Sequence, residues 1–552
     1  MPRRPMHVAE PAGAPLRAAL HALRGELGLP AGFPPHVLAE AEDAAVHPRP
    51  LPDREDATDV PLFTIDPPGA RDLDQAMYLS VRQTGGFRVY YAIADVAAFV
   101  VPGGALDTEA HRRALTVYLP DGRIPLHPEV LSEEAASLLP DEDRPALLWQ
   151  LDLDEFGEVI FTDVRRALVR SRARLDYAGV QRELDAGAAE EPLSLLRDVG
   201  LLREELERAR GGISLTVPEQ EIVPVGADGD GDGGAGGSGE AGDHGGHGGG
   251  SGSGRGSGSR DSARGHGDHG GAAGGAVGGY TLAYRSPLPV EGWNAQISLM
   301  IGMAAADLML AAGTGILRTL PAAPDGAVGR LRRVAHALDV EWPHGTSYAQ
   351  VIRSLDPSHP PSPLNGARPA PRDVPAHHAA FLHECTALLR GAGYTPFDGD
   401  PPDPARARHA ALADDYAHCT APLRRLVDRY TGELCLAAAA GVRVPDWVRA
   451  ALDDLPAEMA AGASRANEAE RECVDLIEAA VLRDRVGEVF DGCVIDVAER
   501  DPTRGTVQLH DPAVVGRLDG DPAGPELPLG RRLRVRLVEA DPGRAKARFV
   551  PA

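Results

Sequence analysis

Alternation of apolar and polar residues begins at Val60 and predicts a β-rich region that continues to about residue 169. PLFTID reads as a strand, and AMYLSVRQ and FRVYYAIADVAAFV flank a Gly-containing turn, which predicts a hairpin. A further strand pair is expected over LLWQLDLDEFGEVIFTDVRRALV, with its turn at Glu155, Phe156 and Gly157. Between these strands, residues 105–118 have a helical pattern. The polar loop PPGARDLDQ joins the first strand to the hairpin, so its acids are expected at a strand end.

Helical periodicity dominates the second half of the chain. Helices are predicted over WNAQISLMIGMAAADLMLAAG, VGRLRRVAHALDV, AHHAAFLHECTALLRGAG, PLRRLVDRYTGELCLAAAAG and residues 457–485. From Gly487 the pattern alternates again, and five short strands predict a small closed barrel of the OB type, a common oligonucleotide binder. A plain β-barrel without a ligand is the alternative. Residues 1–55 read as a short helical stretch followed by a linker.

Residues 226–279 differ in composition from the rest of the chain, being nearly all Gly, Ala, Ser, Asp, His and Arg. Such a segment buries too little apolar surface to offset chain entropy, so we expect a disordered insertion. Its histidines, beside aspartates, would allow a metal-scavenging role, but a solvated linker is favoured because such tracts lack fixed ligand geometry. Those histidines are His244, His247, His266 and His269.

Composition indicates a soluble protein in a reducing compartment. At 552 residues, two or three folding units are expected. The chain has five cysteines and no CxxC pair, which argues against a disulfide framework and a zinc site. No apolar run approaches the ~20 residues that span a bilayer, and the N-terminus lacks an apolar signal core. We therefore expect a cytoplasmic protein without membrane contact.

The formal net charge of −25 opposes nucleic-acid binding unless positive charge is gathered locally. Arginines do gather, in RRALVRSRAR and in RRLVDR. They could line a basic channel while acidic residues elsewhere keep bulk duplex away. The first group comprises Arg165, Arg166, Arg170, Arg172 and Arg174, and the second Arg424, Arg425 and Arg429.

The loop in FTIDPPGARDLDQAMY places Asp66, Asp72 and Asp74 within nine residues. Pro67, Pro68 and Gly69 are expected to turn the chain so that the carboxylates converge. Converging carboxylates repel unless a hard cation neutralises them, and such oxygen ligands suit Mg²⁺ or Mn²⁺. Two ions about 4 Å apart would activate a water and stabilise the leaving oxygen of a phosphodiester. By spacing alone, a solvated acidic turn is the more common outcome.

A series of ordered motifs adds to this interpretation. TIDPPGARDLDQA, YAIADVAAFV and ALDTEAHRRALTVYLPDGRIPLHPEVLSEEAASLLP follow one another, and DYAHCTAPLRRLVDRY comes much later. In order and spacing, they resemble the RNB catalytic domain of ribonuclease II and ribonuclease R over roughly residues 60–485. The resemblance implies an α+β fold, with an RNB catalytic domain over residues 56–485, a mixed sheet surrounded by helices, and a C-terminal five-stranded OB-type barrel over residues 486–552.

The resemblance also implies roles for individual residues. Asp66, Asp72 and Asp74 match the first three acids of the family's Asp-x5-Asp-x-Asp-Asp loop, as metal ligands and catalytic residues, with Asp74 the most critical. Arg424 matches the catalytic arginine. Thr420 is a plausible N-cap and Pro422 a first-turn residue, which would put Arg424 and Arg425 at a phosphate-binding helix N-terminus. A surface arginine pair is the alternative.

Two further residues are implicated in RNA binding. Tyr118 matches an aromatic residue that stacks on a base near the RNA 3′ end, although a buried core tyrosine is the alternative. Glu470 matches a glutamate near the active site, although it could equally be a solvated surface residue.

The chain departs from the family pattern at three places. Gln75 replaces the fourth acid of the loop; its amide oxygen can coordinate a cation but brings no charge. The second stacking position falls near Thr314, where no aromatic residue is present. The first 55 residues are too short for the family's two N-terminal cold-shock barrels, so lower affinity and processivity are expected.

The resemblance implies hydrolytic 3′→5′ removal of nucleoside 5′-monophosphates from single-stranded RNA, with Mg²⁺ or Mn²⁺ as cofactor. The alternative is a catalytically weakened RNB-domain protein with an RNA-binding or regulatory role. A monomer without an obligate protein partner is expected, since no heptad or unpaired apolar stripe stands out.

Overall fold

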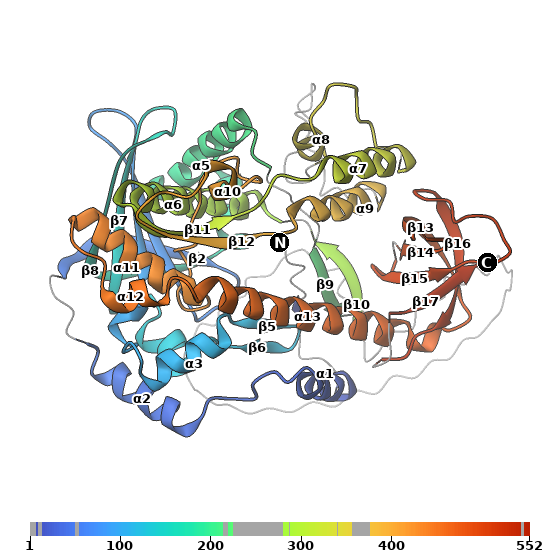
Figure 1. Ribbon diagram of the computed structural model, residues 1–552, viewed down its shortest axis with the longest axis horizontal. Helices are drawn as coiled ribbons and strands as arrows, with labels where there is room; N and C mark the ends of the chain where they lie inside the picture. Colours follow the sequence, from blue (N-terminus) through green and yellow to red (C-terminus); the bar gives the residue numbers. More distant parts are fainter. Residues whose placement is uncertain are drawn as a thin grey trace, which may run out of the picture.

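The computed structural model has a β-barrel at each end of its long axis, with helices between them (Figure 1). It describes residues 7–8, 14–49, 54–213, 219–224, 280–285, 287–338, 340–355, 376–498, 500–509, 511–542 and 546–552. The expected α+β class is confirmed. The expected disordered insertion, residues 226–279, lies outside the described residues.

The first barrel closes in the order β2-β3-β4-β7-β8. Its strands are β2 (Glu55–Asp66), β3 (Gln75–Val81), β4 (Phe87–Ala94), β7 (Asp143–Leu153) and β8 (Val159–Asp176). β2 pairs with β8 in parallel and every other neighbouring pair is antiparallel, so the sheet is mixed, as expected. Both predicted hairpins are present, with the turn at residues 155–157 where expected.

The wall of this barrel is apolar on both faces because alternate residues of each strand enter two different cores. Phe63, Tyr91 and Trp149 pack in the core shared with α5 (Glu191–Arg210), α6 (Pro289–Ala312) and α11 (Leu426–Ala440). Leu62 and Ala92 join the core shared with α2 (Pro35–Val46). The strands therefore form a rigid base for the loops at their ends.

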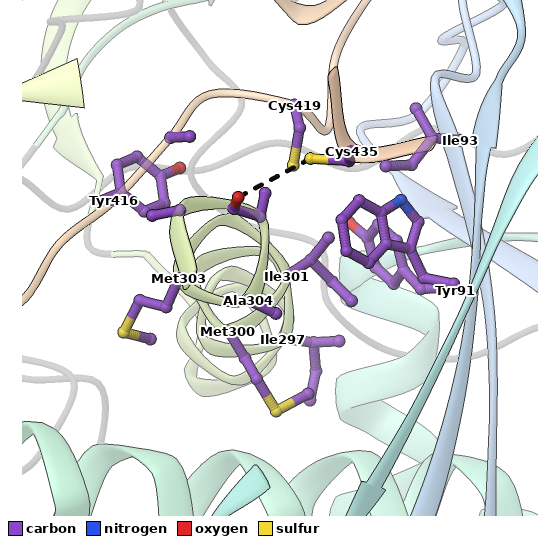
Figure 2. Close-up of a cluster of buried hydrophobic side chains, with 14 of the residues drawn as sticks. Tyr91, Ile93, Ile297, Met300, Ile301, Met303, Ala304, Tyr416, Cys419 and Cys435 are labelled. Carbon is purple, nitrogen blue, oxygen red and sulfur yellow. Dashed lines mark hydrogen bonds between the residues drawn. The ribbon is translucent and has the colours of Figure 1, made fainter. Parts of the chain in front are cut away.

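Helix α6 is the central helix of the largest core (Figure 2). Among the described residues, it is the one helix long and apolar enough to cross a membrane by length and composition, contrary to the sequence-based expectation. However, 56% of its most apolar window is buried inside the protein. Ile297, Met300 and Ile301 are fully buried against neighbouring elements, so α6 is accounted for as a core helix.

The helix predicted over residues 105–118 is shorter than expected. α3 (Ala105–Arg113) ends where Ala114 adopts a φ of 61°. The Ala114 carbonyl then accepts a hydrogen bond from the Leu426 amide at 3.0 Å, and the Thr116 amide donates to the Arg424 carbonyl at 3.0 Å. Pairing with a distant segment therefore overrides helix propensity, and the chain continues as β5 (Val117–Leu119) and β6 (Gly122–Ile124).

The C-terminal barrel confirms the five predicted strands. β13 (Val489–Ala498), β14 (Asp501–Leu509), β15 (Val515–Asp519), β16 (Arg532–Glu539) and β17 (Arg548–Pro551) close in the order β13-β14-β15-β17-β16. One apolar cluster joins the barrel to α13 (Leu455–Leu482) and to α1 (Ala14–Glu26). The barrel is thus packed onto the long helix that runs back toward the first barrel (Figure 1).

The remaining elements are short. The connecting helices are η1 (Val96–Ala98), a π-helical turn η2 (Val130–Ala135), α4 (Tyr177–Ala186), α7 (Asp325–Ala337), α8 (Tyr348–Ser354), α9 (Ala376–Cys385), η3 (Thr386–Leu389), α10 (Pro404–Ala407), α12 (Asp446–Ala451) and η4 (Arg483–Arg485). β1 (His7–Val8), β9 (Glu219–Pro224) and β10 (Tyr280–Arg285) form one small sheet, and β11 (Thr314–Thr319) pairs with β12 (Gly393–Asp398). All five cysteines are buried as free thiols.

Candidate active site

The acidic loop leaves β2 at Asp66 and enters β3 at Gln75, and it turns as the sequence predicted. The Ala70 amide donates to the Pro67 carbonyl at 3.1 Å, and Gly69 has a φ of 82°, a conformation that favours glycine. The turn reverses the chain beyond the end of the barrel strand, so the loop lies at the barrel rim.

A segment that follows the π-helical turn holds the middle of this loop. The Ser137 hydroxyl donates to the Arg71 carbonyl at 2.6 Å and accepts from the Leu73 amide at 3.0 Å. The Leu138 amide donates to the Leu73 carbonyl at 3.0 Å, and the Leu73 side chain is fully buried. The backbone on either side of Asp72 is therefore fixed, so its carboxylate has a defined direction.

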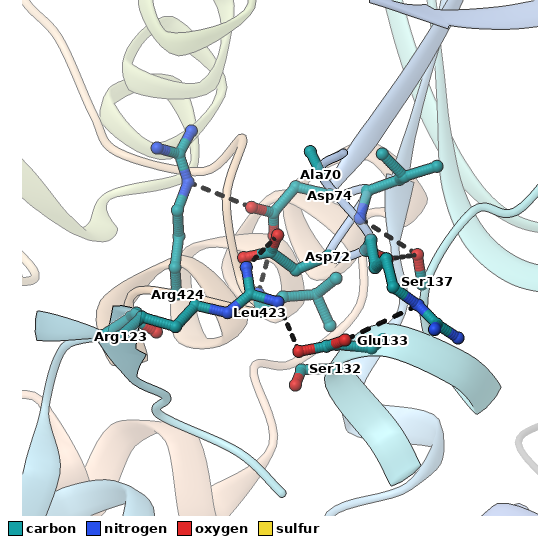
Figure 3. Close-up of polar contacts among 12 residues, drawn as sticks. Ala70, Asp72, Asp74, Arg123, Ser132, Glu133, Ser137, Leu423 and Arg424 are labelled. Atoms are coloured by element: carbon teal, nitrogen blue, oxygen red, sulfur yellow. Dashed lines mark hydrogen bonds and ion pairs between the residues drawn. The ribbon is translucent and has the colours of Figure 1, made fainter. Parts of the chain in front are cut away.

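Asp74 joins the loop to a segment about 350 residues later in the chain (Figure 3). Its Oδ1 accepts from the Leu423 amide at 2.7 Å, and its Oδ2 accepts from Arg424 Nε at 3.0 Å. The side chain is only about 5% exposed. Burial raises the pKa of Asp74 to about 7, against the opposing effect of Arg424. Two of the sequence motifs that carried the family resemblance, the acidic loop and the Arg424 segment, thus meet at one carboxylate.

The segment that carries Arg424 does not begin a helix as predicted. α11 begins at Leu426 with Arg425 at the N-cap position, so Thr420 is not the N-cap and Pro422 lies in a turn before the helix. The physical reason is that the Ala421 amide donates to Asp428 Oδ2 at 2.7 Å, which folds the segment back over the first turn of α11.

Helix α6 supports the same segment from the other side. The Ala417 amide donates to the Gly302 carbonyl at 3.0 Å, and the hydroxyls of Ser298 and Thr420 are 2.9 Å apart. A Cβ on Gly302 would lie 2.1 Å from a ring carbon of Tyr416, so only glycine permits this close approach. The α6 core therefore determines where Arg424 meets Asp74.

The two neighbouring arginines have different surroundings. The Arg424 side chain is 40% exposed, and Figure 3 shows its terminal nitrogens pointing away from Asp74. Arg425 makes a two-pronged ion pair with Asp428, with Nη2 2.8 Å from Oδ2 and Nε 3.0 Å from Oδ1. Arg424 can thus offer donors to an anion, whereas Arg425 stabilises the loop. The RNA-binding role expected for Arg425 stays a prediction.

Asp66 is the last residue of β2 and the first aspartate of the acidic loop. Its Oδ2 is buried and has no hydrogen-bond partner among the described residues. Burial raises the pKa of Asp66 to about 6, and Asp72 contributes in the same direction while Arg424 opposes it. A buried carboxylate oxygen without a donor is a group that a hard cation would satisfy.

Gln75, which stands in place of a fourth acid, is bound to the barrel wall. Tyr91 donates its hydroxyl to Gln75 Oε1 at 2.6 Å. This amide oxygen is the atom that could coordinate a cation, so Tyr91 competes for it. The structure therefore adds a second reason, besides the missing charge, for weak cation binding at this position.

Asp72 is held by a residue that the sequence analysis did not single out. Arg123 Nη1 lies 2.5 Å from Asp72 Oδ1, and Arg123 Nη2 pairs with Glu133 (Figure 3). Arg123 follows the YLPDG run and Glu133 lies in LSEEAAS, so both stand inside a motif that was recognised. The adjacent acids Glu133 and Glu134 within that motif were the available signal for an additional carboxylate at the site.

The remaining predicted residues occupy three different places. Tyr118 is 39% exposed on β5, directly opposite Arg123 of β6, and so lies at the site as expected. Thr314 begins β11 and donates to Asp398 at 3.0 Å. Glu470 is half-buried on α13, the helix that packs beside β5. The roles of Tyr118 and Glu470 in RNA binding stay predictions.

Most arginines in the arginine-rich segment of β8 form ion pairs with neighbouring acids. Arg166 pairs with Asp95 and with Glu433, and Arg170 pairs with Asp143. Arg165 pairs with Glu55 and Asp163. The expectation that this cluster lines a basic channel is therefore wrong for these three arginines, because their charge is locally neutralised. Arg174 is exposed and donates to the Ala70 carbonyl of the acidic loop at 3.4 Å.

Within the part of the chain that the structure describes, no three acidic, histidine or cysteine side chains form a ready metal-binding group. Asp72 is instead paired with Arg123, and Asp74 with Arg424. The donor chemistry nevertheless fits a hard divalent cation, since all donors are carboxylate oxygens and Asp66 Oδ2 is buried without a partner. Asp66, Asp72 and Asp74 are the residues that would hold it.

Comparison with known proteins finds a family match that includes each barrel. Residues 54–232 match the RNB domain, and residues 488–552 match the RNase II-type exonuclease C-terminal S1 domain. The exosome complex exonuclease RRP44 of Mus musculus is 34% identical over 173 residues, 31% of this chain and 18% of that protein. Ribonuclease R of Escherichia coli (strain K12) is 37% identical over 178 residues, 31% of this chain and 22% of that protein. The chain thus aligns with less than a quarter of the length of these curated relatives.

Solved structures share the fold over nearly the whole chain. Mycoplasma genitalium RNase R in complex with ribose-methylated single-stranded RNA has a TM-score of 0.74 at 17% identity, covering 97% of this chain and 78% of that one. Yeast Ssd1, a pseudonuclease, has a TM-score of 0.60 at 14% identity, covering 86% of this chain and 52% of that one. The fold is therefore common to a ribonuclease and to a pseudonuclease.

Proposed function

We propose that this chain, which carries an RNB domain and an RNase II-type C-terminal S1 domain, is a hydrolytic 3′→5′ exoribonuclease. Its substrate would be single-stranded RNA and its products nucleoside 5′-monophosphates. The observation that carries the proposal is the double contact of Asp74 with the Leu423 amide and Arg424 Nε. This contact brings the acidic loop and the arginine segment to the same point beside exposed Tyr118.

The residues at this point have different roles in the proposed phosphodiester cleavage. Arg424 is held in place through its Nε, so its exposed terminal nitrogens are oriented to bind a phosphate and the charge that develops on it. Tyr118 presents a partly exposed ring on which a terminal base would stack without sequence preference. Leu423 and Arg424 together orient the Asp74 carboxylate.

The proposed cofactor is Mg²⁺ or Mn²⁺, held by Asp66, Asp72 and Asp74. When bound, such a cation would activate a water and stabilise the leaving oxygen. The chain's own part is to supply carboxylate oxygens that the barrel rim keeps out of bulk solvent. Ser137 and Leu138 contribute by fixing the loop backbone around Asp72.

The test is degradation of a 5′-labelled single-stranded RNA with Mg²⁺ or Mn²⁺, compared between the wild type and Asp74→Asn. The proposal expects a ladder of shortened 5′-labelled fragments from the wild type and a rate lower by about 10²-fold or more in Asp74→Asn. If neither metal gives a ladder with the wild type, the proposal fails. Equal cleavage by both proteins would show that a contaminant is responsible.

A second candidate is a catalytically weakened RNB-domain protein that binds RNA. Two observations favour it: Gln75 Oε1 is engaged by Tyr91, and Asp72 is paired with Arg123. Ssd1, a pseudonuclease, shares the fold. Tight RNA binding by a wild-type protein that produces no ladder would support this candidate.

Cytoplasmic location and a monomeric state are part of the proposal. Five buried free thiols suit a reducing compartment. Size-exclusion chromatography with light scattering would test the monomer.

A further inference from the structure

Arg123 bridges two carboxylates that come from different elements at the candidate site (Figure 3). One is Asp72, whose Oδ1 lies 2.5 Å from Arg123 Nη1, and the other is Glu133, which pairs with Nη2. All three side chains are less than 25% exposed. Charge-assisted pairs in such a setting are little screened by solvent, so each partner constrains the others.

The elements that carry these residues hold the bridge firmly. Arg123 lies on the short β5–β6 hairpin. Glu133 lies on the π-helical turn, whose Ser132 hydroxyl is 3.3 Å from the carbonyls of His127 and Pro128. π-helical turns are rare and are often found at functional sites. Because Ser137, just after this turn, pins the acidic loop, Glu133 and Asp72 are tied to one another through the backbone as well.

We propose that Arg123 is a positioning residue that competes with the divalent cation for Asp72, and that Glu133 retains Arg123 when the cation takes Asp72. This inference rests on the proposed function, in which Asp72 is a cation ligand. A guanidinium and a metal ion are both positive, so they cannot share the Asp72 oxygens without repulsion.

Glu133 makes the exchange feasible. Releasing Asp72 would leave Arg123 with an unpaired charge in a partly buried place, which is costly unless a second acid is present. Glu133 already contacts the guanidinium, so the charge stays paired after release. The guanidinium of Arg71, which is 57% exposed, also pairs with the Glu133 carboxylate, at a longer distance of 3.6 Å. The arrangement makes cation affinity depend on Arg123 and Glu133 in opposite directions.

The experiment is an isothermal titration calorimetry measurement, in which Mn²⁺ is added to the full-length protein in the absence of RNA. Arg123→Gln frees Asp72, so Mn²⁺ is expected to bind about tenfold more tightly, the effect of losing one competing charge-assisted pair. Arg71→Gln is the matched control, because it removes the same charge beside Glu133 without touching Asp72. Its Mn²⁺ affinity is expected to change less than about threefold.

Glu133→Gln tests the retaining partner. With Asp72 as its sole carboxylate in the bridge, Arg123 is expected to hold it more firmly, so Mn²⁺ binds several-fold more weakly than to the wild type. In the Arg123→Gln background, the same change is expected to have a clearly smaller effect, because there is no guanidinium to retain. An equal effect in both backgrounds would overturn the retaining role of Glu133.

Two outcomes would overturn the role of Arg123. One is unchanged or weaker Mn²⁺ binding by a folded Arg123→Gln protein, and the other is equal tightening by Arg123→Gln and Arg71→Gln. If Arg123→Gln fails to fold, Arg123→Lys decides, since losing the two-pronged geometry while keeping the charge is expected to tighten Mn²⁺ binding by a smaller factor. Failure of the RNA ladder alone would overturn the proposed hydrolysis, while the Mn²⁺ titration would still decide the exchange.

Discussion

At the scale of single residues, two of the three loop aspartates at the candidate site are each paired with a particular arginine. Asp74 is bound by Arg424, and Asp72 by Arg123. Asp66 is left with a buried oxygen that lacks a partner among the described residues. This pairing explains how acids lie close together at a barrel rim without unfolding it, because like charges at short range are otherwise destabilising.

Arg424→Lys should separate phosphate recognition from simple charge. Lysine keeps one positive charge but cannot bind Asp74 through Nε while presenting two further donors to a phosphate. We expect the single-turnover cleavage rate to fall by about 10²-fold or more and the RNA dissociation constant to change less than about threefold. Single-turnover kinetics and fluorescence anisotropy would measure the two quantities. Full activity in Arg424→Lys would show that only charge matters at this position.

His127 should make stability depend on pH. It is 3% exposed, with the Pro422 backbone as hydrogen-bond partner, and burial lowers its pKa from 6.5 to about 3. The folded protein therefore binds fewer protons than the unfolded chain, so the contribution of His127 is complete above pH 6.5. It is lost as pH falls toward 3, by up to about 1.4 kcal/mol per pH unit.

Denaturant unfolding of the wild type and His127→Gln at several pH values would measure this dependence. The difference between the free energies of unfolding of the two proteins should be constant above pH 6.5. Below pH 6.5 the wild type should lose stability relative to His127→Gln. A difference that stays constant down to pH 4 would contradict a buried neutral imidazole.

At the scale of elements, the position of Arg424 depends on the crossing of the 415–425 segment over α6. Gly302 allows the Tyr416 ring to approach the helix, and Asp428 of α11 receives the Ala421 amide. The end of α3 is set by the same segment, since Ala114 and Thr116 pair with Leu426 and Arg424. The end of α3 and the position of Arg424 are thus determined by one set of long-range hydrogen bonds.

Gly302→Ala tests this crossing. The added Cβ would lie 2.1 Å from the Tyr416 ring and 2.6 Å from the Ala417 carbonyl oxygen, so the segment must move. We expect a loss of about 1–3 kcal/mol in the free energy of unfolding, together with slower RNA cleavage. Gly329→Ala in α7 is the matched control, since a Cβ there meets nothing within 4 Å. It should gain about 0.5–1 kcal/mol. Wild-type behaviour of Gly302→Ala in both assays would contradict the role of this contact.

At the scale of the whole molecule, a chain with a net charge of −25 would bind the proposed RNA substrate only through local positive charge. Much of the arginine charge on β8 is neutralised by acids. In the C-terminal barrel, by contrast, Arg532 and Arg534 are exposed on the same face of β16. The two ends of the molecule therefore differ in their capacity to bind phosphates.

Salt dependence of RNA binding should reveal this difference. Replacing Arg532 or Arg534 with Gln is expected to weaken binding uniformly across sequences, and to reduce the slope of log K against log salt by about 0.7 for each phosphate that the variant no longer neutralises. Arg443→Gln is the control, because exposed Arg443 is paired with Asp446 of α12, a helix at the other end of the molecule (Figure 1). Equal slopes for all three variants and the wild type would exclude β16 from the RNA path.

The sequence alone determined the local features of this protein. Alternation and turn residues predicted the hairpins of the first barrel and the five strands of the second. This works because successive residues of a strand point to opposite faces, so the apolar pattern lies in neighbouring positions of the sequence. The ordered motifs predicted the RNB domain and pointed to Asp66, Asp72, Asp74 and Arg424. These conclusions needed no knowledge of which distant residues come together in the fold.

Only the tertiary structure decided how those residues are paired. The start of α11, the end of α3, the neutralised arginines of β8 and the bridge from Asp72 through Arg123 to Glu133 all depend on interactions between remote parts of the chain. Neither helix propensity nor the number of charges predicts which residue a given side chain will contact. For the bridge from Asp72 through Arg123 to Glu133, partial burial makes the pairing matter, because a charge withdrawn from solvent needs a specific partner.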